Sequence, residues 1–460
     1  MTELFASLVN AIRQSQLLRV LLIGFLVLLL QIPIAMIDGL IGGRTTRHNE
    51  AVEEVTGKWG REQTVIGPVL VVPYVVRWSE GEGENRKLRT KTRYGSFLPE
   101  KLAIDGRIET EIRSRGIFDV PVYKMTLRVE GGFSTPQFAD WGVKSEDVLW
   151  SRAEIWVGIS DARAIQSQAN LTWNGEAIPF EPGTGEFGGS GSGSGESDVA
   201  RSGIHASLKR WPIGKGTGFS FPLVLNGSTG AFFAPLGRET TVSLASNWSN
   251  PSFQGNWLPG DRTVRPDGFQ SKWSIPSLGR NYPQRWASDS AVAHEIDKST
   301  FGVQLLAPVD PYRMSERSVK YEALFLMLTF LSLWLFEVLV RRRLHSLQYL
   351  LVGAAMCLFY LLLLSLAEHL GFLPAYLLAS IAVAGLITGY CASILRKPGW
   401  ALIVGALVAA LYAYLYVLLN NEDYALLYGS VGLFIILAAV MYLTRKIDWD
   451  NFAAQGSKRG

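Results

Sequence analysis

The sequence predicts an α+β membrane protein. One N-terminal transmembrane helix and a C-terminal five-helix transmembrane bundle flank a large, mostly antiparallel, sandwich-like β domain. Three features of the 460 residues support this fold class. One apolar segment lies near the start, further apolar segments crowd into residues 321–443, and about 280 mostly polar residues separate the two regions. Since about 20 apolar residues cross a bilayer as a helix, each apolar segment is long enough to span the membrane.

The apolar segments divide into six predicted spans. The first covers residues 17–37. It exceeds the roughly 7–15 apolar residues of a signal peptide and lacks a clear cleavage site, so we expect a retained anchor. The polar region that follows it, residues 38–320, is the predicted β domain. The other five spans form the predicted bundle in residues 321–443, at about residues 322–340, 348–367, 375–395, 400–419 and 424–443.

The positive charges near the spans predict the orientation of the chain. Lysine and arginine occur in alternate short loops and directly after the last span, as Arg341, Arg342, Arg343, Arg396, Lys397, Arg445 and Lys446. The opposite short loops, residues 371–374 and 420–423, contain neither. Because cytoplasmic loops are enriched in these residues, we expect residues 1–16 and the tail 444–460 to be cytoplasmic. The β domain then lies on the other side of the membrane.

The polar region begins with a predicted amphipathic helix at residues 49–60 and continues with strands. Residues 68–76 are typical of a buried strand with prolines at its edges. Turn signals separate nine further strand-like runs, at residues 88–97, 107–113, 122–129, 153–159, 169–173, 204–208, 218–225, 240–246 and 269–275. This regular spacing favours an antiparallel β-sandwich or a related multi-strand sheet.

One segment of the β domain, residues 182–199, contains a run of glycine and serine that is typical of a flexible coil. A phosphate-binding loop would need Lys-Ser or Lys-Thr after the glycines and a strand-to-helix setting, and the sequence has neither. We therefore expect a surface loop.

The composition argues against several classes of function. Net charge is only +4 without a long basic run, so we expect no nucleic-acid partner. Both cysteines, Cys357 and Cys391, fall inside apolar spans, which leaves the β domain without disulfides or thiolate metal ligands. The five histidines lack metal-ligand spacing, and no hydrolase motif occurs. We expect no catalytic residue, no metal and no cofactor.

Tryptophan is the main source of candidate binding residues in the β domain. Eleven of the 14 tryptophans lie in or beside it, and aromatic side chains in strands usually pack in the core. Trp248 and Trp257 flank a loop-like stretch, residues 251–255, and are the better candidates for exposure. Exposed, they would suit stacking on the sugar rings of an envelope glycan.

Ionisable residues in the spans are the other candidates, because charge is costly within a bilayer. Glu337 lies one turn before Arg341, so an intramembrane charge pair near the cytoplasmic face would satisfy it. Glu368 and His369 end the third span at its outer side, where they would suit a proton, an ion or a lipid headgroup. As interfacial residues they also need no special role.

Four blocks of residues, in order along nearly the whole chain, resemble the CreD family of bacterial inner-membrane proteins. The first runs from residue 48 through residue 60 and continues with Gln63 and residues 67–74. The second runs from Ser246 to Phe253 and continues at Gly255, 258–259, 268–269 and Trp273. The third covers residues 282–284 and the stretch from residue 301 to residue 312. The fourth, and most specific, covers residues 320–321, 328–330, 335–337, 348–353 and 364–369. Ser346 departs from the family, which usually has proline there.

The resemblance implies a location and a role that the residues alone do not. Family members lie in the inner membrane of Gram-negative bacteria with a large periplasmic domain. They are associated with envelope integrity, the stress response and tolerance to colicins and β-lactams, under a CreBC-type two-component system. The family has no established enzymatic activity, so the resemblance implies no catalytic residue in this sequence. We expect a non-enzymatic protein of the lipid bilayer whose domain binds an envelope glycan or a protein partner; the alternative is a component of a transport or flippase system.

Overall fold

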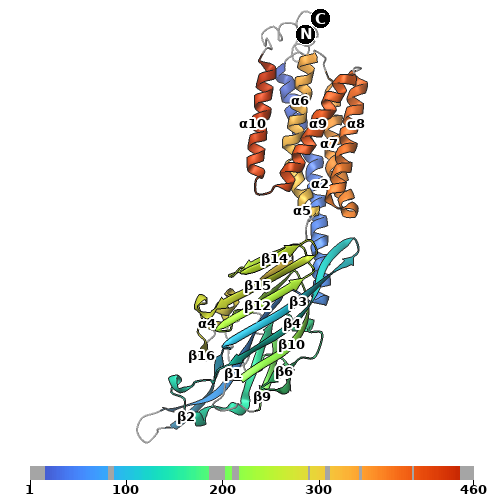
Figure 1. Ribbon diagram of the computed structural model, residues 1–460. Helices are drawn as coiled ribbons and strands as arrows, with labels where there is room; N and C mark the ends of the chain where they lie inside the picture. Colours follow the sequence, from blue (N-terminus) through green and yellow to red (C-terminus); the bar gives the residue numbers. More distant parts are fainter. Residues whose placement is uncertain are drawn as a thin grey trace, which may run out of the picture. The chain divides into compact units, whose positions relative to one another are not determined.

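The computed structural model describes residues 16–80, 87–185, 202–209, 217–287, 291–305, 311–340, 344–395 and 398–445 (Figure 1). The chain divides into two compact units. One consists of Met1–Asn49 and Val309–Gly460 and is helical; the other, Glu50–Pro308, is the β domain. Most of the predicted Gly/Ser loop, residues 186–199, lies outside the described residues.

Helix α2 (Gln16–Trp59) is a single helix of 44 residues that continues from the helical unit into the β domain. The sequence predicted two separate helices there, and this was wrong. The intervening segment contains glycines but no proline. In addition, the Thr45 and Thr46 hydroxyls each donate a hydrogen bond of 3.0 Å to the carbonyl four residues earlier, a contact that helical backbone permits. The helix therefore continues through the polar segment.

The C-terminal helices are α5 (Pro311–Lys320), α6 (Glu322–Val340), α7 (Ser346–Leu370), α8 (Phe372–Leu395), α9 (Pro398–Asn420) and α10 (Ala425–Thr444). Among the described residues, α2 and α7–α10 are each long and apolar enough to cross a membrane. Helix α6 meets the same test together with α5, from which it is bent by 49°. The five apolar helices α6–α10 were expected from the sequence, whereas the bend before the second span was not.

Among the five helices that are each long and apolar enough to span a membrane alone, α7 is the most buried, with 56% of its most apolar segment inside the protein. Gly353 permits this close packing, because a Cβ atom there would overlap Leu30 of α2 and Phe330 of α6. The helix begins with a cap in which the His345 ring accepts a hydrogen bond from the Leu347 amide at 3.2 Å and the Gln348 side chain accepts one from the His345 amide at 3.0 Å. Ser346 is thus the first helical residue, a position that also accommodates proline.

The β domain contains two sheets, each built from strands that are distant in sequence. The nine-stranded sheet has the order β13 (Pro251–Gly255), β17 (Phe301–Leu305), β11 (Gly230–Phe233), β1 (Gln63–Glu80), β5 (Ala153–Ile159), β9 (Gly203–Leu208) and β8 (Glu181–Pro182); β2 (Lys87–Phe97) joins β1, and β16 (Arg285–Ala287) joins β2. The eight-stranded sheet has the order β14 (Asp261–Arg265), β15 (Gly268–Pro276), β12 (Glu239–Ser246), β3 (Lys101–Arg115), β4 (Phe118–Phe133), β10 (Thr217–Ser228), β6 (Asn170–Trp173) and β7 (Glu176–Pro179).

Strand pairing is mostly antiparallel, as the sequence predicted. Among the described strands only β1–β11 and β3–β12 pair in parallel. A single hydrophobic core draws on both sheets, which makes the domain sandwich-like. Residues Val69, Leu70, Val71 and Val72 of β1 are completely buried, which explains their continuous apolar run. A short helix, α4 (Ala291–Lys298), precedes β17.

All ten predicted strand-like runs fall in strands, but several short strands were missed. The clearest case is β13, residues 251–255, which the sequence suggested was a loop. Pro251 begins this strand at the edge of its sheet, where a missing amide donor is tolerated, and Gly255 ends it at a φ of 93°. The segment is ordered by antiparallel pairing with β17, about 50 residues away.

Candidate functional site

Glu368 of α7 lies in a polar cluster within the helical unit. Its Oε1 atom is 3.4 Å from Nε of Arg44 and accepts a hydrogen bond of 3.2 Å from the Tyr312 hydroxyl. The ring of His48 packs at 5.6 Å from that of Tyr312. The Glu368 side chain is only 8% exposed, and Arg44 and Tyr312 supply the partners without which its buried charge would be costly. Sequence analysis found Glu368 but not its partners, which come from α2 and α5.

His369 does not share the buried position of Glu368. Its side chain is exposed, although the two residues are neighbours in sequence. Successive helical residues point about 100° apart, which explains why only one of them faces the cluster. The two residues therefore do not form one site.

Glu322, the first residue of α6, is a buried carboxylic acid that sequence analysis did not single out. It is 2% exposed, and Oε2 accepts a hydrogen bond of 3.0 Å from Nε2 of Gln31. Its other oxygen, Oε1, has no hydrogen-bond partner among the described residues. Cys357 and Tyr360 of α7 lie within electrostatic range. The only signal in the sequence was an acidic residue at the start of an apolar run.

Glu337 is buried near the other end of α6. It is 7% exposed and accepts a hydrogen bond of 3.2 Å from the hydroxyl of Tyr349 on α7. Arg341, its predicted ion-pair partner, lies outside the described residues. The structure therefore shows a neutral donor for Glu337 and does not test the predicted charge pair.

Trp248 and Trp257, which the sequence made the better candidates for exposure, are half-buried and pack against the core of the β domain. The Trp257 ring meets Phe301 edge to face at 6.1 Å, and its carbonyl accepts a hydrogen bond from the Trp273 indole at 3.1 Å. The stretch between the two tryptophans, which the sequence suggested was a loop, is strand β13, and this strand holds both residues against the core. Among the tryptophans of the β domain that the structure describes, Trp78 on β1 is the exposed one, at 43%.

The outward side of the eight-stranded sheet presents a broad polar surface. We call it the open face and define it by Asp105 and Arg107 of β3, Ser243 and Ala245 of β12, and Gln270 and Lys272 of β15. Adjoining depressions of about 530, 310 and 420 Å³ share these residues. Figure 1 shows the strands that carry them lying side by side. Depressions of this size suit part of a larger ligand.

Charges on this surface alternate in sign across the strands. The cross-strand neighbours are Asp105 with Arg128, Glu109 with Lys124, and Asp261 with Lys272. Opposite charges in such positions stabilise a sheet and leave little net charge. The surface is therefore suited to hydrogen bonding with a polar partner more than to concentrating an ion. Among the described residues, no group of three His, Cys, Asp or Glu side chains is placed to hold a metal.

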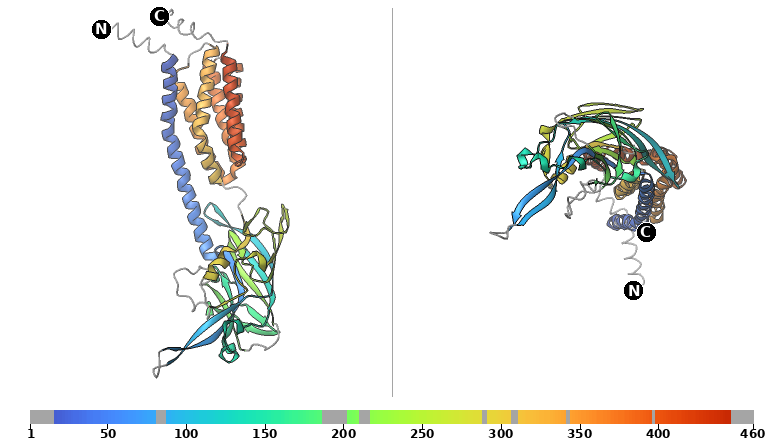
Figure 2. Two further views of the ribbon diagram at one scale, coloured as in Figure 1. Left: turned by 90° about the vertical axis from the view of Figure 1, so that its left-hand side faces the viewer. Right: turned by 90° about the horizontal axis from the view of Figure 1, so that it is seen from below.

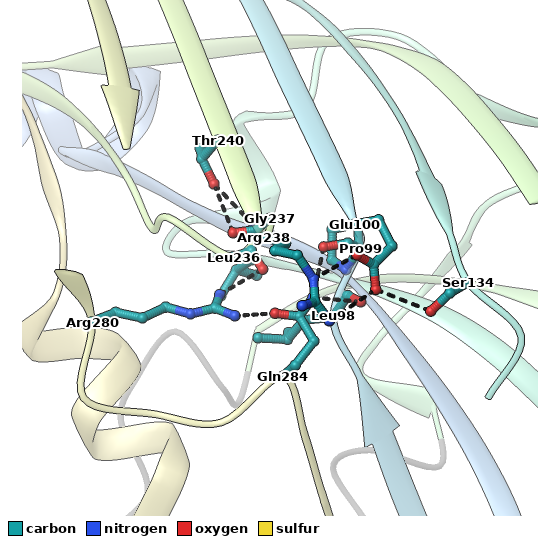
Figure 3. A network of polar contacts seen from close by, with 10 residues as sticks. All are labelled: Leu98, Pro99, Glu100, Ser134, Leu236, Gly237, Arg238, Thr240, Arg280 and Gln284. Atoms are coloured by element: carbon teal, nitrogen blue, oxygen red, sulfur yellow. Dashed lines mark hydrogen bonds and ion pairs between the residues drawn. The ribbon is translucent and has the colours of Figure 1, made fainter. Parts of the chain in front are cut away.

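A partly buried network fixes the strands that form this surface (Figure 3). Arg280 donates hydrogen bonds to the carbonyls of Pro235 and Leu236, at 3.1 and 2.7 Å, and to the side chain of Gln284. Gln284 Nε2 in turn donates to the carbonyls of Leu98 and Pro99, at 3.0 and 2.7 Å. Burial lowers the pKa of the Arg280 guanidinium. Together, Arg280 and Gln284 make five hydrogen bonds that hold this loop in place.

This network joins the starts of β3 and β12, the parallel pair at the centre of the open face. Next to it, the backbone amide of Arg238 donates to the carbonyl of Pro99 at 2.9 Å, and Arg238 forms an ion pair of 2.6 Å with Glu100. Gln284 belongs to the Tyr-Pro-Gln block that resembles the CreD family. The block thus has a structural role in setting the register of β3 and β12.

These units define a multi-pass membrane protein with one large β domain between its first and second membrane helices. The profile of the family described as Inner membrane protein CreD matches residues 15–450. The Inner membrane protein CreD of Escherichia coli (strain K12) is 32% identical over 431 residues, which cover 93% of this chain and 92% of that protein. The chain therefore belongs to the CreD family and is an inner membrane protein, which confirms the resemblance seen in the sequence.

Proposed function

We propose that this protein supports the integrity of the cell envelope without enzymatic activity, by binding an envelope component or a partner protein through a periplasmic β domain. The observation that carries the proposal is the open face, a polar and nearly charge-balanced surface with adjoining depressions. The periplasmic placement is supported by the lysine and arginine residues in alternate loops.

The chemistry of the open face favours recognition over catalysis. Three carboxylates beside its depressions, Asp105, Glu109 and Asp261, each lie opposite a cation across the strands, so these three are not placed as free acids or bases. Ser243, the hydroxyl between Asp105 and Lys272, has no histidine across the strands beside it. Such a surface provides hydrogen-bond donors and acceptors in fixed positions.

Bulky substitutions on the open face test this function in the full-length protein. A strain that lacks the gene would be challenged with a β-lactam and complemented with Ser243→Trp or Ala245→Trp. We expect loss of rescue, because an indole there fills the depressions between β3, β12 and β15. Gln254→Trp, at an exposed position of β13 in the other sheet, is the matched control and should rescue. Full rescue by both face variants at normal abundance would overturn the proposal.

A transport or flippase component is the second candidate function, and Glu322 is the observation that favours it. This carboxyl is buried at the bend between α5 and α6, with one oxygen lacking a partner among the described residues. Ionisable groups inside membrane domains commonly carry protons or bind ions. Glu322→Gln, Glu337→Gln and Glu368→Gln, tested singly and together in the same strain, should then abolish rescue. Full rescue by the triple variant would exclude this function.

A further inference from the structure

Strands β1 and β2 extend beyond the core of the β domain as a two-stranded ribbon (Figure 2). We call residues 75–80 and 87–93 the hairpin arm. Val76 is the last residue of β1 that packs against the core, whereas every residue from Arg77 to Glu80 is exposed. On β2, residues 87–91 are exposed as well. The arm therefore presents its side chains to solvent.

One face of the arm carries a ladder of four cations. Lys87, Arg89, Lys91 and Arg93 occupy alternate positions of β2 and are all exposed. Because side chains alternate between the two faces of a strand, these four project from the same face. Neighbouring cations on that face are about 6.8 Å apart, so the ladder extends over roughly 20 Å.

The opposite strand adds an aromatic ring to the same face. Trp78 pairs directly with Arg89, and directly opposed residues of an antiparallel pair project together. Trp78 is 43% exposed. Exposed tryptophan offers a flat apolar surface beside a polar group, which suits contact with the face of a sugar ring.

Most of the charge on the arm is not neutralised. Arg89 pairs with Glu80 at 2.8 Å, but Lys87 and Lys91 form no ion pair with any residue that the structure describes. Arg77 projects from the other face and pairs with Asp147 at 2.6 Å, which tethers the base of the arm. Of the five basic residues of the described arm, Arg77 and Arg89 are paired, which leaves the three positive charges of Lys87, Lys91 and Arg93 without an ion-pair partner among the described residues.

Charged edge strands also prevent sheets from pairing with one another, and this purpose alone would explain some lysines on β2. It does not require all four cations on one face, and an exposed tryptophan among them works against it. The arrangement is therefore better explained by a ligand that carries regularly spaced negative charges.

We propose that the hairpin arm binds a linear anionic polysaccharide of the envelope. The cations would pair with its acidic groups, and Trp78 would stack on a sugar ring. A straight ladder fits an extended chain, because successive charges of the polymer meet successive cations. This inference rests on the proposed function only in that the β domain faces the periplasm.

The test uses the full-length protein in nanodiscs of neutral lipid and fluorescent oligogalacturonate, a linear polysaccharide with a carboxylate on each sugar. Neutral dextran of matched length and vesicles of phosphatidylglycerol are the comparison ligands. We expect oligogalacturonate to bind, with an affinity that falls as salt rises. The quadruple variant Lys87→Gln, Arg89→Gln, Lys91→Gln, Arg93→Gln should bind at least about tenfold more weakly, since four exposed ion pairs each contribute modestly.

A matched variant removes four exposed charges elsewhere in the β domain, by Lys58→Gln, Lys144→Gln, Lys209→Gln and Lys298→Gln. It should retain wild-type affinity, and Trp78→Ala should weaken binding without changing its salt dependence. Equal loss in both quadruple variants, equal binding of dextran, or binding to the vesicles alone would overturn the proposal. If oligogalacturonate fails while Ser243→Trp still abolishes rescue, only the arm inference falls and the proposed function stands.

Discussion

Gln284→Met tests whether the partly buried network of Arg280 and Gln284 sets the two central strands of the open face. Methionine keeps the length of the side chain but removes three hydrogen bonds, two donated to the carbonyls of Leu98 and Pro99 and one accepted from Arg280. With each bond contributing about 1 kcal/mol net, the loss is about 2–3 kcal/mol. The local opening equilibrium at the starts of β3 and β12 should then rise about 30- to 150-fold.

Hydrogen exchange followed by mass spectrometry on the full-length protein measures this opening directly. The reporting amides are those of Arg238 and Glu239, which donate to the carbonyls of Pro99 and Glu100 at 2.9 and 3.0 Å. Gln254→Met is the matched control, because that side chain is exposed and, among the described residues, forms a hydrogen bond only with Ser252. Unchanged exchange in Gln284→Met would show that strand pairing alone holds the register, and our account of the network would be refuted.

Three further perturbations address the helical unit. Gly353→Leu should lower thermal stability in detergent by about 1–3 kcal/mol or prevent accumulation, because a larger side chain overlaps helices α2 and α6; unchanged melting would contradict that packing. Tyr349→Phe removes the hydroxyl that donates to buried Glu337 and should lower the free energy of unfolding by about 1–3 kcal/mol. In a Glu337→Leu background the same Tyr349→Phe change should lower it by less, because no carboxylate is then left without its donor. A hydrogen bond from Arg313 holds the pKa of Glu422 below its usual value, so this ion pair stabilises the loop before α10 above the unfolded pKa of about 4.5. That stabilisation is lost as the pH falls through the lowered pKa, and limited proteolysis of the loop should accelerate only on such acidification. Faster cleavage already at neutral pH would contradict this prediction.

The sequence alone was sufficient to predict those elements whose signal lies within a short stretch of consecutive residues. The run from Val69 to Val72 reads as a strand because all four residues are buried on both faces of the sheet. The apolar spans were equally clear, since a bilayer requires long uninterrupted apolar helices. These signals lie within a few consecutive residues, so no tertiary information was needed to recognise them.

Contacts between distant segments were beyond the reach of sequence patterns. Gln31 and Glu322 are 291 residues apart, and neither residue alone indicates the other as its partner. Likewise, β13 becomes a strand only because β17 pairs with it, so its proline and glycine suggested a loop. The hairpin arm was overlooked for a related reason: alternate cations on β2 matter only once the strand is seen to leave the core.

The packing of α6 decides which experiment can separate the two candidate functions. A chain that ends at Val340 keeps the β domain but removes α7–α10, and with them the surfaces that bury Phe325 and Phe330, which are 1% and 0% exposed. Glu337 would also lose the hydroxyl of Tyr349. We expect this shortened protein to be degraded, as measured by its abundance in the membrane fraction. Its failure to rescue would then reflect lost packing and would not favour transport. Stable accumulation would instead show that α6 needs no partner, and rescue by that form would place the function in the β domain.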